Sequence, residues 1–206
     1  MSSGLQQTPE DILAFWFEDA ADDPSKAMQR SAFWFEASAA VDESISRRFS
    51  AALECAARGE FAAWEQTARP CLALVLLLDQ FSRNIYRGMA EAFQHDSQAL
   101  DVASRGVAAG YLEHLSPVEQ CMFILPYEHS EERSVQRAGI ELFEGVVDRA
   151  GAEWKPSARG SLVYAKRHME IIERFGRFPH RNVALGREST IEERDYLIDG
   201  GESFGQ

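Results

Sequence analysis

The sequence has little cysteine. Its 206 residues include three, Cys55, Cys71 and Cys121, which lie far apart and form no C-x-x-C pair. Such a set supports neither a disulfide framework nor a thiol redox site. Because each cysteine lies among apolar residues, we expect buried free thiols, and we expect the protein to be cytoplasmic, since that compartment is reducing.

Long apolar segments and an excess of basic residues are also missing. The longest apolar run, residues 71–78, is far too short to cross a bilayer, and the first residues lack a basic stretch followed by an apolar one. With 21 Lys and Arg against 33 Asp and Glu, the net charge is −12, and such a surface repels nucleic acids and anionic lipids. We therefore expect neither a membrane nor a nucleic-acid partner; oligomeric state is left open.

The usual motifs of metal, nucleotide and serine-hydrolase sites do not occur. There is no H-E-x-x-H, no Cys/His cluster with zinc spacing and no EF-hand loop, so we expect no metal site. There is no G-x-G-x-x-G or G-x-x-x-x-G-K-[ST] loop to hold phosphates, and no G-x-S-x-G turn. The sequence therefore predicts no cofactor.

What the sequence does contain is a series of signals for the beginning and end of helices. Thr8-Pro9-Glu10-Asp11 reads as an N-cap, a proline and a first acidic turn, and residues 116–119 and 190–193 read as capping boxes. Sustained β alternation is missing. The pattern predicts helices beginning near residue 9 and over 41–58, 67–87, 96–109, 117–126, 130–149, 156–175 and 190–198, with the triplets at 15–17 and 33–35 as aromatic anchors of the core.

Composition and length agree with one folded unit. Hydrophobic residues make up 45% of the chain and include 13 Phe and 4 Trp, which is ample for a core. No linker rich in proline or glycine divides the sequence. We predict one all-α domain over residues 1–206, with its core at about 8–199 and a polar tail at 200–206.

The helix predicted over residues 67–87 is apolar on every side before it turns polar, which is typical of a central helix. In its polar part, Asp79, Arg83 and Arg87 recur every four residues and share one face, with Asn84 beside them. An internal ion pair that closes a buried helix is one interpretation. The other is that Asp79 orients Arg83 and leaves Arg87 and Asn84 free for a ligand.

Residues 174–182 (RFGRFPHRN) form a basic island in this acidic chain. Between residues 166 and 187 there are six Lys and Arg against two Glu. A helix cannot run undisturbed through Gly176 and Pro179, so the basic groups are expected at a bend where they converge. Convergent arginines of this kind favour an anion site.

Two histidine-containing positions are further candidates. Glu128-His129 lies at a junction between helices, where the histidine has a neighbouring carboxylate and suits a general base, although the capping residue Ser130 could alone explain the segment. His168 falls inside the apolar arc of its helix. A buried, hydrogen-bonded histidine explains that placement, and a pocket wall is the alternative.

Several segments together resemble one bacterial family, the domain of unknown function 924. They are residues 12–17 (ILAFWF), 77–88 (LLDQFSRNIYRG), 125–131 (LPYEHSE), His168 with 174–182, and 185–190 (LGREST). Ser82 departs from the family pattern, which has proline there, so the helix is expected to continue more smoothly. The resemblance implies antiparallel helix pairs stacked in a right-handed, tetratricopeptide-like array. It implies no known activity, because the family is uncharacterised.

Three functions remain open from the sequence. A binding module would hold a small anion or a peptide carboxylate with its arginines and polar neighbours. A structural polar network would lock the helices together without a ligand. An enzyme acting on an anionic small molecule would move protons with Glu128, His129 or His180. The predicted ligand-binding residues are Arg83, Asn84, Arg87, His168, Arg174, Arg177, His180, Arg181 and Asn182.

Overall fold

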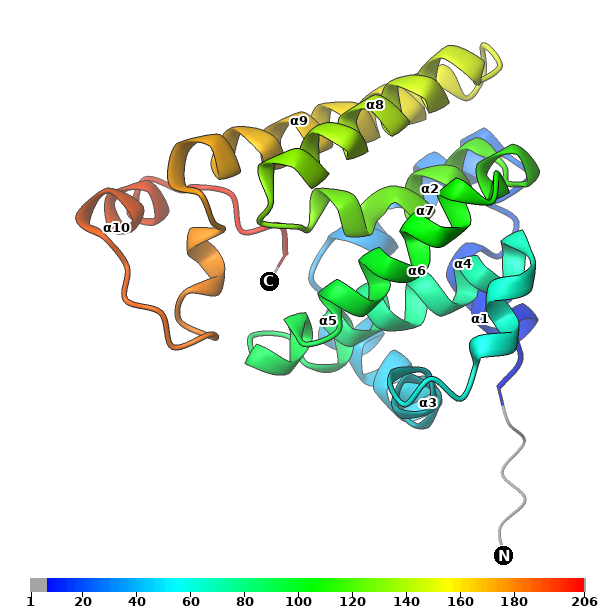
Figure 1. Ribbon diagram of the computed structural model, residues 1–206, viewed down its shortest axis with the longest axis horizontal. Helices are drawn as coiled ribbons and strands as arrows, with labels where there is room; N and C mark the ends of the chain where they lie inside the picture. The colour runs from blue at the N-terminus through cyan, green and yellow to red at the C-terminus, as the bar shows by residue number, and fades with distance from the viewer. Residues whose placement is uncertain (1–6, 206) are drawn as a thin grey trace, which may run out of the picture.

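The computed structural model describes residues 7–205, and helices joined by short turns make up its regular structure (Figure 1). The predicted all-α class is confirmed, since residues 7–205 contain no strand. The α-helices are α1 Pro9–Phe17, α2 Pro24–Phe35, α3 Ala39–Ala57, α4 Ala68–Leu76, α5 Ser82–Ile85, α6 Asp96–Ala108, α7 Pro117–Glu128, α8 Arg133–Arg149, α9 Lys155–Phe175 and α10 Ile191–Ile198. Short 3₁₀ turns are η1 Ala62–Gln66, η3 Ala90–Phe93, η4 Tyr111–His114 and η5 Pro179–Arg181, and η2 Leu77–Phe81 is π-helical.

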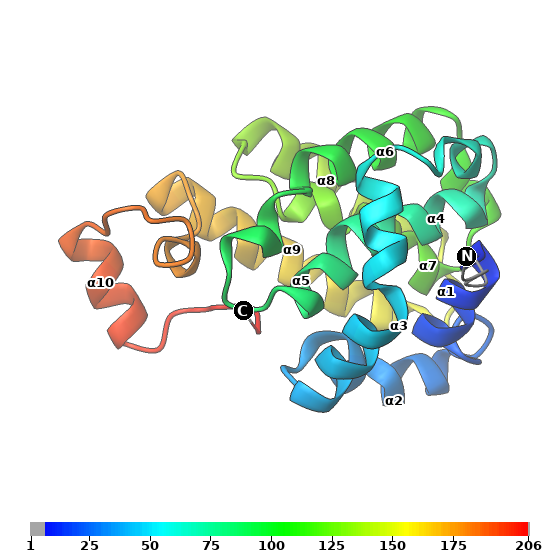
Figure 2. The same ribbon diagram turned by 90° about the horizontal axis from the view of Figure 1, so that it is seen from below.

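The long hairpin of α8 and α9 lies along one side of the molecule and packs on α7 (Figure 1). On the other side of α7, the central helix α4 is packed between α1, α6 and α7. The segment that carries α10 extends away from this body, and the chain then returns toward its centre (Figure 2). This return brings the end of the chain beside the middle helices.

The predicted capping signals are borne out. Thr8 and Thr190 each form a capping box, in which the side chain and the third helical residue satisfy each other's backbone N–H groups, and at Ser116 the Glu119 carboxylate accepts from the Ser116 N–H. Gly176 ends α9 in the left-handed region, at φ 70°, which favours glycine. Local hydrogen bonding thus fixes where these helices begin and end.

One helix escaped the sequence analysis. α2 begins at Pro24, where the Asp23 carboxylate accepts from two backbone N–H groups, and ends at Phe35. Its aromatic residues meet those of α1: Phe15 and Phe33 rings are 5.7 Å apart, and Trp34 donates to the Trp16 carbonyl at 2.8 Å. Of the triplet predicted to anchor the core, Trp34 is buried and Phe33 packs against the core, but Phe35 is 52% exposed. The missed signal was an Asp-Pro start without a strong apolar periodicity.

Two predicted helix ends were wrong. α7 continues through Pro126 to Glu128, so the proline interrupts the hydrogen bonding without ending the helix. Its surroundings are buried, and packing outweighs the lost N–H bond. α8 begins at Arg133 and not at Ser130, whose hydroxyl accepts from the Glu132 N–H before the helix starts.

The expected smooth helix around Ser82 was also wrong. Residues 77–81 form a π-helical turn between α4 and α5. The Ser82 hydroxyl donates to the carbonyl of Leu78 at 2.7 Å, a bond that competes with regular backbone pairing. Because π-turns widen the helix and re-aim its side chains, Asp79 and Gln80 are displayed differently from their α-helical register.

Most of the core is one cluster around α4, whose residues 71–76 are all buried. A second, small cluster of Ile171, Ile172 and Phe178 lies under the C-terminal bend. Cys71 and Cys121 are buried, Cys55 is half-buried, and all three are free. None of the helices in residues 7–205 combines the length and apolar character that a bilayer-spanning helix requires. The tetratricopeptide-like array stays a prediction.

Candidate functional site

The π-turn places Asp79 at the centre of a buried polar network. The carboxylate has no exposed surface. It lies 3.1 Å from the Arg83 guanidinium, accepts from His129 Nδ1 at 2.7 Å and accepts from Gln80 Nε2 at 2.6 Å. The predicted Asp79–Arg83 ion pair therefore exists. His129, at the end of α7, is a further hydrogen-bond partner of the Asp79 carboxylate.

A second carboxylate, Asp96 at the start of α6, joins this network to the C-terminal bend. Arg83 donates to both Asp96 oxygens, at 2.9 and 3.0 Å, and Arg181 donates to one of them at 3.1 Å. Arg181 also donates to the His129 carbonyl at 3.0 Å and lies over the rings of Phe93 and Phe178. The bend predicted from residues 174–182 thus reaches Glu128-His129 through Arg181.

The surroundings of Asp79 and Glu128 shift the pKa values of these two carboxyl groups in opposite directions. Burial alone would raise the pKa of Asp79, but the charge of Arg83 and the contact with His129 lower it below its ordinary range. Burial and the negative charge of Asp79 raise the pKa of Glu128 to about 8. Burial, followed by the charge of Arg83, lowers the pKa of His129, and burial lowers that of His168 well below its usual value. At neutral pH, Asp79 is charged whereas both histidines are neutral.

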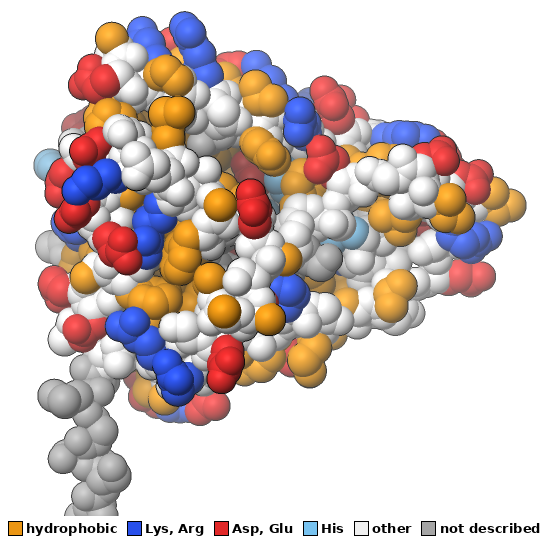
Figure 3. Space-filling model, turned by 180° about the vertical axis from the view of Figure 1, so that it is seen from behind, with side chains coloured by type: hydrophobic (Ala, Val, Ile, Leu, Met, Phe, Trp, Pro, Cys, Tyr) orange, Lys and Arg blue, Asp and Glu red, His pale blue; other side chains and the backbone are white. Residues whose placement is uncertain are grey.

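A pocket of about 740 Å³ opens beside this network, within the size range of small-molecule sites. One wall is mostly apolar and comes from α2, α7 and α9, with Trp34, Met122 and Leu125 among its side chains. The other end is polar, and residues 200–205 form part of the rim. The face seen in Figure 3 is hollowed near its centre, with histidine and acidic side chains visible at depth. The polar lining includes Gln80, Arg83, Asn84, Arg87, Glu128, His129 and His168, and the carboxylates of Glu36 and Glu202 also contribute to it.

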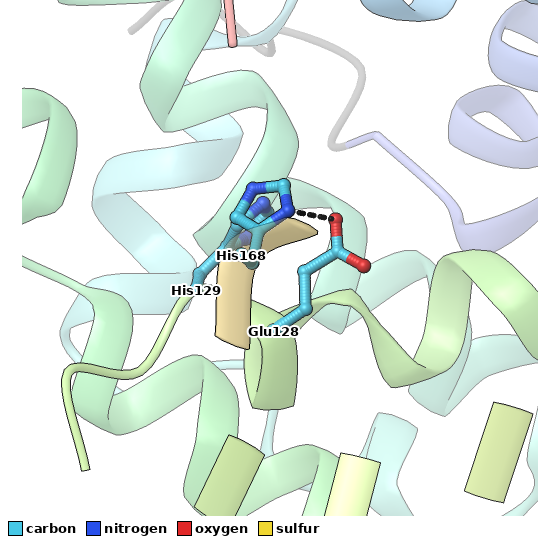
Figure 4. Close-up of side chains that lie close together, drawn as sticks. All are labelled: Glu128, His129 and His168. Carbon is cyan, nitrogen blue, oxygen red and sulfur yellow. Dashed lines mark ion pairs between the residues drawn. The ribbon is translucent and has the colours of Figure 1, made fainter. Parts of the chain in front are cut away.

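Three of these side chains converge (Figure 4). Glu128 and His129 come from the end of α7, and His168 from the middle of α9. The Glu128 carboxylate lies 3.6 Å from His168 Nδ1, and the His129 and His168 rings are 5.9 Å apart. The helix packing thus brings together residues that the sequence analysis treated as separate candidates.

Asn84 and Arg87 line the pocket but are already bonded. Both donate to Asp42 of α3, Asn84 at 2.8 Å and Arg87 at 2.7 and 2.8 Å. The remaining Arg87 nitrogen donates to the carbonyl of Gly205. Asn84 and Arg87 therefore lie on the pocket side of the network, and both are hydrogen-bonded to other parts of the chain.

The rest of the predicted basic segment lies elsewhere. Arg177 pairs with Glu193 at 2.6 and 2.8 Å and holds α10, and Arg174 pairs with Glu192 on the surface. Asn182 is buried beside the same Glu193. With His180 and Arg181, these residues do not belong to the pocket lining described for residues 7–205. Arg83, Asn84, Arg87 and His168 do.

His180 is the titratable group of the bend whose environment is least suited to charge. Its Nδ1 is buried and makes no hydrogen bond within the described residues, and its ring lies 5.5 Å from that of Phe178. Burial, then the charges of Arg181 and Arg83, lowers its pKa to about 3. The imidazole is therefore neutral in the folded protein at any pH near neutrality.

This predicts a specific loss of stability in mild acid. In the unfolded chain His180 takes up a proton below about pH 6.5, while the folded chain does not until about pH 3, so folding is opposed as pH falls between these values. From pH 7.5 to 5 the wild type should lose about 2 kcal/mol more than His180→Gln, which cannot titrate. Urea unfolding at both pH values measures this difference; equal losses would contradict it.

Several site residues were missed by sequence reasoning. Asp42 and Asp96 are the partners of the pocket arginines, and Phe204 stacks on the His168 ring with centroids 3.6 Å apart. Asp42 is 45 residues from Arg87, and the tail is farther still. No local pattern signals partners at such separations.

Comparisons with known proteins agree with this structure. The family model described as "Bacterial protein of unknown function (DUF924)" matches residues 12–201. A solved structure of a protein of unknown function, ATU0120 from Agrobacterium tumefaciens, is 37% identical, with 93% of this chain and 97% of that one covered and a TM-score of 0.78. No curated protein matches the chain significantly.

Proposed function

The chain belongs to the bacterial family of unknown function DUF924, and we propose that it is a binding module for a small carboxylate ligand with an apolar or aromatic body. The ligand occupies the pocket of about 740 Å³, with its body along the wall of α2, α7 and α9. Its carboxylate meets the polar end, where Arg87, Asn84 and His168 lie. A short peptide end has the same chemistry.

The observation that carries this proposal is what the chain's own tail does at the rim. Phe204 stacks on His168, and Gly205 offers its carbonyl oxygen to Arg87. Phe204 has φ 52°, in the left-handed region that an aromatic residue rarely adopts, so these contacts outweigh a strained backbone. The tail therefore marks one subsite for an aromatic group and one for an oxygen acceptor.

The pairing of the arginines narrows the ligand class. Arg83 is matched by Asp79 and Asp96, and Arg87 by Asp42, so the pocket has no large positive excess. A bare inorganic anion gains little from such a site. A carboxylate attached to an apolar body gains both hydrogen bonds and buried surface.

The same pairs also support a structural role. Arg87–Asp42 and Arg83–Asp96 tie α3 and α6 to the segment after α4, and Arg181–Asp96 adds the C-terminal bend. The two roles are compatible: carboxylates that fix the arginines preorganise the pocket. Acid–base catalysis is a second candidate, because Asp79 holds His129 Nδ1 and leaves its Nε2 as the basic nitrogen of a pocket-lining ring.

The binding proposal is tested with N-acetyl-phenylalanine as the probe, in buffer with a chelator, by isothermal titration calorimetry. Phe204→Gly removes the tail's aromatic group from His168, so we expect about tenfold tighter binding in this variant, because the ligand no longer competes with it. N-acetyl-phenylalaninamide, which lacks the carboxylate, should bind more weakly than the acid, as should sulfate.

Arg174→Ala is the matched control, because it removes an arginine that lies outside the pocket lining. It should bind the probe as the wild type does, whereas Arg87→Ala should bind it at least tenfold more weakly. No saturable binding to Phe204→Gly at millimolar probe, or equal binding of acid and amide, would overturn the proposal.

A further inference from the structure

We propose that Glu128, His129 and His168 form a site for a divalent transition-metal ion, of which Zn²⁺ is the type. The three residues lie at the polar end of the pocket. This inference rests on the proposed function in one respect: the pocket must be accessible to solutes, including metal ions.

The donor set and its spacing support a metal. Each of the three side chains offers a ligand atom, and these atoms lie within 4.8 Å of one another (Figure 4). Two histidines and one carboxylate are a common set for zinc and for other first-row metals, with bonds of about 2.0–2.2 Å. Ligand atoms around such an ion lie roughly 3.3 Å apart, so the ligands must close by up to about 1.5 Å. The flexible Glu128 side chain can supply most of this movement.

The hydrogen bonds behind the two rings prepare them for coordination. His129 Nδ1 donates to the charged Asp79 carboxylate at 2.7 Å, and His168 Nδ1 donates to the Tyr164 carbonyl at 2.9 Å. Because both acceptors lack a proton, each Nδ1 bears the hydrogen and each Nε2 keeps its lone pair. The ion would therefore bind Nε2 of both rings, and the Glu128 carboxylate, which lies 3.6 Å from Nδ1 of His168, must turn toward Nε2 to share it. Carboxylate and backbone-carbonyl acceptors are the partners that metal-binding histidines have.

The Glu128 carboxylate has no evident stabilising role in the fold. It is 6% exposed, yet its carboxylate makes no hydrogen bond within the described residues, and its one ion-pair contact within 4 Å there is with His168 Nδ1, at 3.6 Å. A buried carboxylate without a donor is costly unless a cation or a proton satisfies it. A divalent ion shared with the two histidines would do so.

Neither the tail nor the sequence spacing opposes this site. Phe204 covers the face of the His168 ring, whereas a metal binds at the ring edge, in its plane. Motif analysis predicted no metal, because Glu128 and His129 are adjacent and the third ligand comes from another helix. With three protein ligands, the ion would keep an open position that the carboxylate of a pocket ligand can take.

The test uses the full-length protein, stripped with a chelator and dialysed, and titrated with zinc chloride alone by calorimetry. Cobalt(II) absorption reports the coordination geometry in parallel. We expect one equivalent to bind to the wild type, and Glu128→Gln and His168→Asn each to bind at least tenfold more weakly. Circular dichroism and the thermal midpoint without metal establish that each variant is folded.

Cys121→Ser and His180→Gln are the matched controls. Cys121 lines the pocket, the half-buried His180 ring lies 5.8 Å from that of the pocket-lining Phe204, and both residues are outside the proposed ligand set. Both should bind zinc as the wild type does. Equal zinc binding in wild type and Glu128→Gln, less than half an equivalent at micromolar zinc, or loss of binding in Cys121→Ser would each overturn the site. The titration contains no organic ligand and the probe experiment contains a chelator, so either proposal can fail alone.

Discussion

Replacing Asp79 with asparagine should lower the free energy of unfolding by about 3–5 kcal/mol, the range found when one partner of a buried ion pair is removed. Asp79 is fully buried and contacts Arg83, His129 and Gln80. The amide keeps the shape but removes the charge that compensates the buried guanidinium. Urea denaturation at neutral pH measures the loss.

The pH dependence of this loss follows from the lowered pKa of Asp79. In the unfolded chain the carboxylate takes up a proton near pH 3.9, and in the folded chain only below that value, so its contribution is present above about pH 3.9 and fades as pH falls further. The difference between wild type and Asp79→Asn should therefore shrink as pH falls below about 3.9. Glu192→Gln, which removes one partner of an exposed ion pair, is the control and should leave the free energy of unfolding unchanged. A loss below 1 kcal/mol in Asp79→Asn would show that the pair does not hold the fold.

Arg181→Ala should have the second largest effect, a loss of about 2–4 kcal/mol. The Arg181 side chain is 7% exposed and lies over two aromatic rings while it bonds to Asp96 and to the His129 carbonyl. Its removal therefore detaches the C-terminal bend from the helices around α4. We expect hydrogen exchange to rise first in α10 and in residues 176–190.

Two variants sharpen this prediction. Arg181→Lys keeps the charge but loses the planar fork and much of the ring stacking, so it should lie between the wild type and Arg181→Ala. Arg174→Ala removes a surface arginine that also lies over aromatic rings, and it should leave the midpoint unchanged. Similar exchange in α10 for Arg181→Ala and Arg174→Ala would mean that Arg181 is not the link.

Much of the helical framework could be read from local chemistry. Thr8, Ser116, Thr190 and Gly176 mark helix ends through hydrogen bonds that span three or four residues, and the apolar run at residues 71–78 marks the central helix. The failures occurred where distant packing decides. Pro126 stays inside α7 because the helix is buried, and the π-turn at 77–81 depends on what surrounds Asp79.

The candidate site, too, could be predicted only in part from the sequence. The sequence pointed to Arg83 because it shares a helix face with Asp79, to Glu128 because a histidine follows it, and to His168 because it falls inside an apolar arc. The sequence could not tell which arginines face the pocket and which stabilise the fold. Their partners lie many residues away: Asp42 is 45 residues from Arg87, Asp96 is 13 from Arg83, and Glu193 is 16 from Arg177.

The sequence by itself determined the all-α class, the family and the types of residue that carry charge in an acidic protein. The tertiary structure alone decided that Glu128 and His129 meet His168, that Arg181 holds the bend to the body, and that Phe204 stacks on His168 at the pocket rim. The physical reason is one of range. Caps and periodicity act over a few residues, whereas burial, ion pairing and the shape of a pocket arise when helices far apart in the chain pack together.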